Sequence, residues 1–128
     1  MFLQYYVTES ATGNRVNIEI DAATQADLDA TRNGWQTVWN TDFILDPQKE
    51  KYAAKTEDGE IIALGAYRVR KGSVAVYIAY IESQPESNPT LTEHKKYSGI
   101  GKAMIAFGIQ LSIDASCNGV VVFEAKTD

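Results

Sequence analysis

The sequence has one cysteine, one histidine, little basic charge and no apolar run of the roughly 18 residues that a membrane span requires. A lone Cys117 cannot close an internal disulfide, which excludes a disulfide-stapled fold. There are 12 lysines and arginines against 17 aspartates and glutamates, and this formal net charge of −5 is atypical of nucleic-acid-binding domains. The chain also starts without the basic segment of a signal peptide. We therefore expect a cytoplasmic protein with no nucleic-acid partner, no membrane partner and no metal site.

The sequence does contain enough apolar residues for a core. Of its 128 residues 45% are hydrophobic, so residues 1–128 are expected to form a single compact domain. An aromatic run over Phe2–Val7 and alternating polar and apolar residues over Arg15–Ile20 predict a hairpin at the start of the chain. Asp21 can cap a helix over Ala22–Thr31. The following segment is too interrupted to assign beyond a short helix or a loop.

The middle of the chain predicts three consecutive antiparallel strands, Lys51–Thr56, Ile61–Val69 and Ser73–Ser83. Asp58-Gly59 joins the first two, and this pair is a strong hairpin signal because the turn needs positive φ. The third strand is apolar almost throughout, which indicates that both of its faces are covered. It should therefore lie inside the sheet.

A helix and a last strand are predicted at the end of the chain, after a long polar loop over Gln84–Lys96. Apolar residues at helical spacing predict a helix over Ile100–Ser116 that packs on the sheet: Ile100, Met104, Phe107 and Leu111. A strand over Val120–Phe123 then completes a strand–helix–strand crossover, so it should run parallel to Ser73–Ser83. The predicted class is α+β, with a mixed sheet that is mainly antiparallel.

The turn that opens this helix contains two glycines one residue apart, Gly99 and Gly101. Glycines expose the backbone N–H groups of a helix start, which is suited to binding a phosphate. A Walker A loop would need a glycine at Lys96 and a serine or threonine at Ala103, and a dinucleotide fingerprint would need a third glycine at Met104. Neither of these two phosphate motifs fits the chain.

The turn resembles the pyrophosphate-binding motif of the GNAT superfamily of acyl-CoA-dependent N-acetyltransferases, Arg/Gln-x-x-Gly-x-Gly/Ala. Lys96, Gly99 and Gly101 occupy its positions, and the family has the same order of strand, proline-containing segment, turn, helix and strand. The resemblance covers about Lys51 to Lys126. It implies a GNAT-like fold that here lacks the usual last helix and strands. The sheet edge left open by that loss favours a homodimer.

The resemblance also implies a binding site for acetyl-CoA. Backbone groups of Ile81, Glu82 and Ser83 would pair with the pantetheine arm like a further strand. The backbone amides of the turn would receive the pyrophosphate: Tyr97, Ser98, Gly99, Ile100, Gly101 and Lys102. The side chains of Lys96 and Lys102 either add charge to this site or are solvated at a helix start.

The implied reaction is direct attack of an amine on the thioester, with a base that removes a proton. Glu82 is our first choice for this base, because it ends the central strand beside the expected thioester, and rivals lie in the loop that follows: Glu86, Glu93 and His94. The tyrosine acid of the family lies in the missing part, so Tyr5, Tyr6 or a second subunit would have to replace it.

The acceptor amine cannot be deduced from the sequence, although an acidic protein slightly favours a cationic one. Trp35, Trp39 and Phe43 either line the acceptor pocket or form a hydrophobic plug. The alternative to an N-acetyltransferase is a non-catalytic GNAT-like module that binds acyl-CoA or another protein. A small structural protein without a nucleotide site is a third interpretation.

Overall fold

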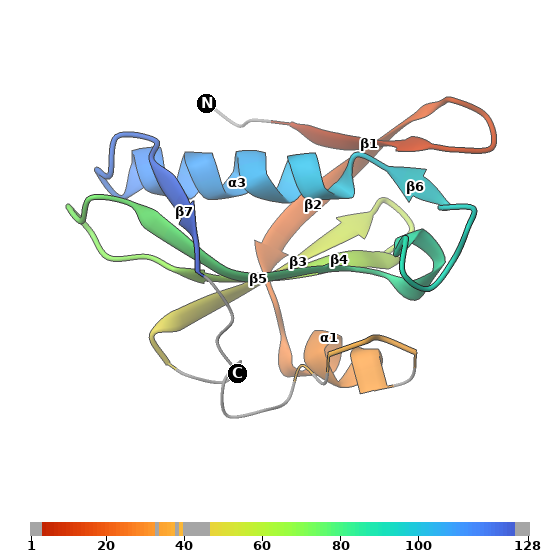
Figure 1. Cartoon of the computed structure of the whole chain (residues 1–128), viewed down its shortest axis with the longest axis horizontal. Coiled ribbons are helices and arrows are strands. Elements are labelled where there is room, and N and C mark those ends of the chain that lie inside the picture. The colour runs from red at the N-terminus through yellow and green to blue at the C-terminus, as the bar shows by residue number, and fades with distance from the viewer. Residues whose placement is uncertain (1–3, 33, 38, 40–46, 125–128) are drawn as a thin grey trace.

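A computed structural model describes the chain except for residues 1–3, 33, 38, 40–46 and 125–128, and it gives only the main chain of residue 32. The described residues form one curled sheet of seven strands, in the order β6-β1-β2-β3-β4-β5-β7 (Figure 1). The elements in chain order are β1 (Tyr5–Glu9), β2 (Arg15–Ala22), α1 (Gln25–Asp29), the 3-10 helix η1 (Ala30–Arg32), β3 (Lys49–Thr56), β4 (Ile61–Arg68), β5 (Val76–Ser83), the 3-10 helix η2 (Pro85–Ser87), β6 (Tyr97–Ser98), α3 (Ile100–Asp114) and β7 (Val121–Phe123).

The sheet confirms the predicted α+β class and its mixed strand directions. The pairs β1–β2, β2–β3, β3–β4 and β4–β5 are antiparallel, and β5–β7 is parallel, as the crossover through α3 predicted. β5 has a neighbour on each side and is an inner strand, also as predicted. The two-residue strand β6 was not predicted, because its pairing with β1 depends on residues about ninety positions apart.

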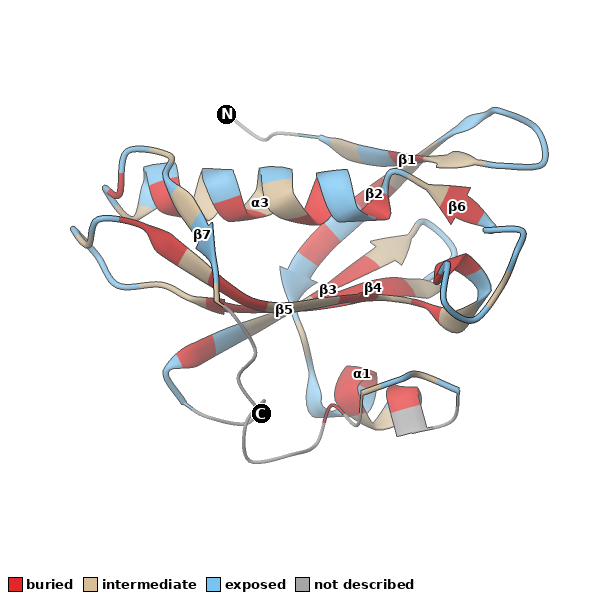
Figure 2. Cartoon of the chain, viewed as in Figure 1, coloured by how far each residue is buried: buried red, intermediate tan, exposed pale blue. Residues whose placement is uncertain are grey.

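The two faces of the sheet bury separate cores (Figure 2). α3 lies across one face, where Met104 is fully buried and Tyr67 donates a 2.8 Å hydrogen bond from its hydroxyl to the Met104 carbonyl. Gly65 of β4 lies under this contact, since a Cβ atom there would approach Met104 Cε to 2.9 Å. α1 covers the other face, where Leu28 and Trp39 pack on Leu64 in the second core. We call these the α3 face and the α1 face.

The start of α1 differs from the prediction. The assignment of Asp21 as the helix cap is wrong, because β2 continues through Ala22 and Asp21 pairs with Ala53 of β3. Thr24 caps the helix instead, with its hydroxyl accepting from the Asp27 N–H at 3.1 Å. Asp27 in turn accepts from the Thr24 N–H at 2.9 Å, which completes a capping box.

Asp27 makes part of the stability of the protein depend on pH. Burial raises the pKa of its carboxyl, but the hydrogen bond from the Thr24 backbone and the ion pair with Lys55 at 2.9 Å outweigh this, so the pKa is lowered overall. A lowered folded pKa stabilises the fold above the unfolded value of about 3.9, and this contribution is lost as pH falls through the folded pKa. We expect Asp27→Asn to lose about 1 kcal/mol at pH 7 and little at pH 2. Urea unfolding of both proteins from pH 2 to 7 measures this, and parallel stability curves would contradict it.

Candidate functional site

The parallel strands β5 and β7 are paired over only part of β5. Val76, Tyr77 and Ile78 of β5 are paired with Val121, Val122 and Phe123. Among the described residues, the last hydrogen bond of the pair runs from the Glu124 N–H to the Ile78 carbonyl, at 3.0 Å. Beyond it β5 continues to Ser83, and no described residue pairs with Ile81–Ser83 on the β7 side. We call this divergence the fork, and Ile81–Ser83 its open edge.

A β-bulge lies at the same point of β5. Tyr67 of β4 is paired with Ile78 and Ala66 with Tyr80, so Ala79 has no partner on β4. An extra residue in one strand bends it and increases its twist. After the bulge, Tyr80 packs in the core of the α1 face and Ile81 in that of the α3 face. The bulge therefore bends β5 where the strands diverge.

Glu82 points to the α1 face, where its carboxylate accepts three hydrogen bonds. The donors are the Gln36 N–H at 2.6 Å, the Thr37 N–H at 3.2 Å and the Trp39 indole N–H at 2.8 Å. Only 4% of Glu82 is exposed. Such contacts fix the chain that supplies the donors. Glu82 thus anchors this segment to the end of β5, and its role as a base stays a prediction.

The turn that contains Gly99 and Gly101, which we call the glycine turn, begins at β6, where Thr8 of β1 is paired with Ser98. Gly99 precedes α3 with φ of 86°, a left-handed conformation that favours glycine. Within the described part of the chain, nothing accepts a hydrogen bond from the N–H groups of Ile100, Gly101 or Lys102. A Cβ at Gly101 would meet no atom within 4 Å. These three amides have no acceptor in the described residues, which is usual for the first turn of a helix. The Tyr97 N–H, which the sequence analysis also assigned to the pyrophosphate, instead donates to Ser87 Oγ at 3.1 Å and is not free to bind it.

Glu60 connects the glycine turn to the end of β5, although β6 and β5 are not neighbours in the sheet. Its carboxylate accepts from Lys96 Nζ at 3.0 Å, from Tyr97 Oη at 3.4 Å and from Gln84 Nε2 at 2.9 Å. The hydrogen bond to Glu60 raises the pKa of Lys96. Burial raises the pKa of Glu60, but the hydrogen bonds from Gln84 and Lys96 outweigh it and lower the pKa overall. Lys96 thus already has a carboxylate partner, whereas Lys102 is exposed.

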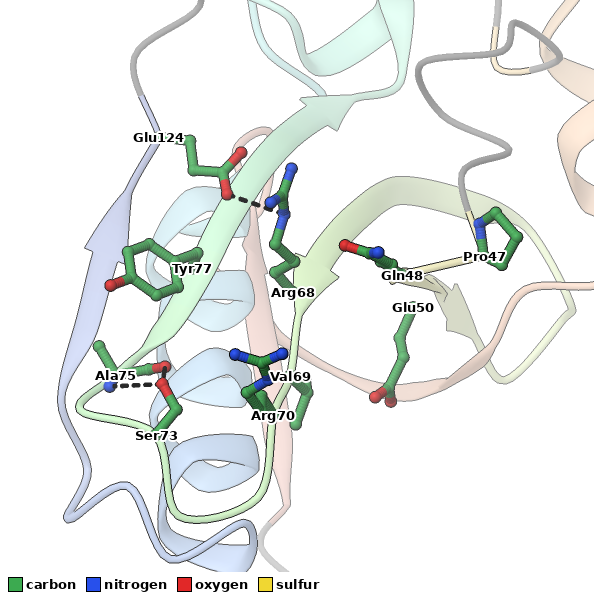
Figure 3. Close-up of a pocket in the computed structure, with 10 residues that line it drawn as sticks. All are labelled: Pro47, Gln48, Glu50, Arg68, Val69, Arg70, Ser73, Ala75, Tyr77 and Glu124. Atoms are coloured by element: carbon green, nitrogen blue, oxygen red, sulfur yellow. Dashed lines mark hydrogen bonds and ion pairs between the residues drawn. The ribbon is translucent and has the colours of Figure 1, made fainter.

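Two cavities lie beside these features. The helix-start cavity, of about 590 Å³, lies between β1 and the first turns of α3, and is lined by Gln4, Tyr5, Tyr6, Val7, Thr8, Ser98, Gly99, Lys102, Ala103 and Ala106. The fork cavity, of about 600 Å³, is lined by Pro47, Gln48, Glu50, Arg68, Val69, Arg70, Ser73, Ala75, Tyr77 and Glu124 (Figure 3). In Figure 3, α3 lies behind the strands, and the side chains of Arg68, Tyr77 and Glu124 lie in front of them.

Other predicted residues lie apart from the fork. The rival bases are exposed in the loop before β6: Glu86, Glu93 and His94. Trp39 is fully buried and belongs to the core of the α1 face, Trp35 is half-buried beside it, and Phe43 lies outside the described residues. Of the proposed acids, Tyr6 is exposed. Tyr5 packs edge-on against Phe107, and burial raises the pKa of its hydroxyl.

Three polar residues of the site were missed by the sequence analysis, namely Glu60, Arg68 and Glu124. Arg68 Nε lies 3.1 Å from Glu124 Oε1, so this ion pair joins the end of β4 to the residue after β7. Each of the three stands at an end of a predicted strand or in a hairpin turn, where charged residues are ordinary. Only the prediction that β7 lies beside β5 could have drawn attention to Glu124.

The described residues contain no group of three or more His, Cys, Asp or Glu side chains that could hold a metal ion. In the same residues no helix has the length and apolar character needed to span a bilayer. Fold and site together define an α+β protein with a forked parallel strand pair and a charged cavity at the fork. A scan against protein-family models and a search of curated proteins gave no match to this chain.

Proposed function

We propose that the protein binds an acyl-CoA such as acetyl-CoA and transfers the acyl group to an amine, as the GNAT resemblance implies. The observation that carries this proposal is the fork. Among the described residues, Ile81–Ser83 of β5 have no strand beside them on the side of β7, whose parallel pairing is described as far as Ile78. An extended ligand with amide groups can pair with such an edge as a further strand does.

A second feature supports the proposal, namely the glycine turn at the start of α3. The N–H groups of Ile100, Gly101 and Lys102 and the positive end of the helix form a site for a diphosphate. Because each amide-to-phosphate hydrogen bond is charge-assisted, a few of them provide most of the affinity that a nucleotide cosubstrate needs. The ionic contact between Lys96 and Glu60 leaves the main chain as the principal donor.

The proposed reaction has no covalent enzyme intermediate. The amine nitrogen attacks the thioester carbonyl carbon, a C–N bond forms, and the C–S bond breaks. The nitrogen gives up a proton to a base or to water, and the thiolate takes up a proton as it leaves. Glu82 remains the proposed base. Since both of its oxygens accept hydrogen bonds in the structure, it would act through water or after releasing one donor.

The same contacts of Glu82 favour a second candidate function, a non-catalytic module that binds acyl-CoA or a protein. A carboxylate that holds Gln36, Thr37 and Trp39 has a structural role that needs no catalysis. A protein partner, including a second copy, would find β7 at the edge of the described sheet with Phe123 59% exposed. The homodimer and the cytoplasmic location stay predictions.

Two measurements on the wild-type protein test these functions. Calorimetry with acetyl-CoA should show saturable binding, whereas the absence of heat at millimolar ligand would contradict the acyltransferase and the acyl-CoA-binding module, and would leave a protein-binding module or a purely structural protein. Release of free thiol from acetyl-CoA with a panel of amines should be detectable for an acyltransferase. Tight binding without amine-dependent thiol release would contradict catalysis and support the binding module.

A further inference from the structure

The fork cavity begins where the parallel pairing of β5 and β7 ends. Glu124, whose N–H makes the last hydrogen bond of that pairing, lines the cavity together with Tyr77 of β5. Both side chains lie on the side away from α3 (Figure 3). A thioester ligand that entered along Ile81–Ser83 would have its reactive group directed toward Ile78, where β5 and β7 are still paired. The cavity therefore lies where an acceptor amine would have to bind to reach the thioester.

The cavity presents charges of both signs. Arg68 and Arg70 are opposed by Glu50 and Glu124, and Arg68 is paired with Glu124 at 3.1 Å. No partner for the Arg70 guanidinium is found among the residues that the structure describes. The volume of the fork cavity, about 600 Å³, lies within the range of small-molecule sites and exceeds the size of a single amino acid.

The backbone that carries Arg70 is fixed by hydrogen bonds on both sides. Its carbonyl accepts from the Ser73 N–H at 3.1 Å and from the thiol of the buried Cys117 at 3.4 Å. The turn that follows is tied to the end of α3 by a 2.7 Å hydrogen bond from the Gly72 N–H to the Ala115 carbonyl. The main chain at Arg70 is thus held in place, and little ordering of the backbone is required when Arg70 binds a ligand.

We propose that the fork cavity is the acceptor site and that it takes an amine which also carries a carboxylate, such as an amino acid or a short peptide. The proposal rests on the acyl transfer proposed above and names its substrate class. Arg70 binds the carboxylate of the acceptor, for which a planar guanidinium is well suited. Glu124 receives the ammonium group at the fork, and Arg68 holds Glu124 in place. Once the ammonium group has lost a proton, the amine nitrogen lies next to the thioester.

Binding of paired ligands tests the proposal. Amino acids and dipeptides would each be compared with their own carboxamide, which keeps the ammonium and lacks the carboxylate. Their dissociation constants would be measured by calorimetry with saturating CoA. We expect wild type to prefer at least one carboxylate over its amide by about 10- to 100-fold. Arg70→Gln should erase this preference, and Glu124→Gln should weaken binding of both members of the pair.

The exposed neighbour Lys71 offers a matched control, because Lys71→Gln removes a positive charge one residue from Arg70 and outside the cavity. This variant should keep the preference. All three variants should keep acetyl-CoA affinity, since none of the residues lies at the open edge or the glycine turn. Equal binding of every acid and its amide, or an equal effect of Lys71→Gln and Arg70→Gln, would overturn the proposal. If wild type failed to bind CoA at all, the proposed function itself would fail.

Discussion

Gly101→Glu is expected to weaken acetyl-CoA binding by at least about 100-fold without destabilising the protein. The residue is exposed, and a Cβ there would meet no atom within 4 Å, so the longer side chain fits the free protein. A carboxylate in the first turn of a helix is also favourable toward the helix dipole. In the complex, however, it occupies the space of the diphosphate and repels it. Loss of two charge-assisted contacts, about 3 kcal/mol, corresponds to this factor of about 100.

The control for this prediction is Gln110→Glu, which places the same charge on the same helix about two and a half turns further along. Calorimetry should give wild-type affinity for this variant, and urea unfolding should give stable proteins in both cases. If the two variants bound acetyl-CoA equally well, the diphosphate would not lie at the glycine turn. If Gly101→Glu unfolded at markedly lower urea, unfolding would explain the loss of binding, and Gly101→Gln, which has the same bulk without the charge, would replace it.

Glu82→Ala should lower the free energy of unfolding by about 3–5 kcal/mol. The substitution leaves three N–H donors without their acceptor, including the indole of the fully buried Trp39. Leaving buried donors unsatisfied costs far more than the net gain of an average hydrogen bond. Urea or thermal unfolding measures this change. A loss of less than about 1 kcal/mol would mean that the carboxylate does not hold this segment in solution.

Glu82→Gln separates the structural role of Glu82 from a catalytic one. The amide has the same shape and keeps one oxygen acceptor, so we expect a loss of stability of about half that of Glu82→Ala. If Glu82 is the base, Glu82→Gln should lose thiol release at temperatures where it remains folded. Full activity in a folded Glu82→Gln protein would exclude Glu82 as the base and leave it as an anchor.

The parts of the fold that the sequence predicted correctly are those set by neighbouring residues. Asp58-Gly59 marks the β3–β4 turn by its own backbone preference, and the apolar run of β5 marks an inner strand. The parallel direction of β7 follows from the helix between β5 and β7, which carries the chain back to the end of the sheet where β5 began. Asp21 was misassigned as a helix cap because it pairs with Ala53 of β3, a residue far away in the sequence. Local residue preferences do not reveal such a pairing.

The candidate site was less accessible from the sequence for the same reason. The glycine turn was visible because its function depends on consecutive residues. The carboxylate contacts of Glu60 and Glu82 were not, since each joins segments more than twenty residues apart. The pairing of Lys96 with Glu60 likewise depends on the curl of the sheet, which no local pattern predicts. Arg68 and Glu124 meet only because β4 and β7 both lie beside β5, on opposite sides of it.

The central claim is that one ligand occupies both the open edge of β5 and the start of α3. Titration of the isotopically labelled protein with acetyl-CoA, followed by amide NMR spectra, tests it most directly. The amide signals of Ile81–Ser83 and of Gly99–Lys102 should shift together with one dissociation constant, while those of the β3–β4 turn at Asp58 and Gly59 stay unchanged. Shifts confined to one of the two segments, or found only elsewhere, would contradict the account.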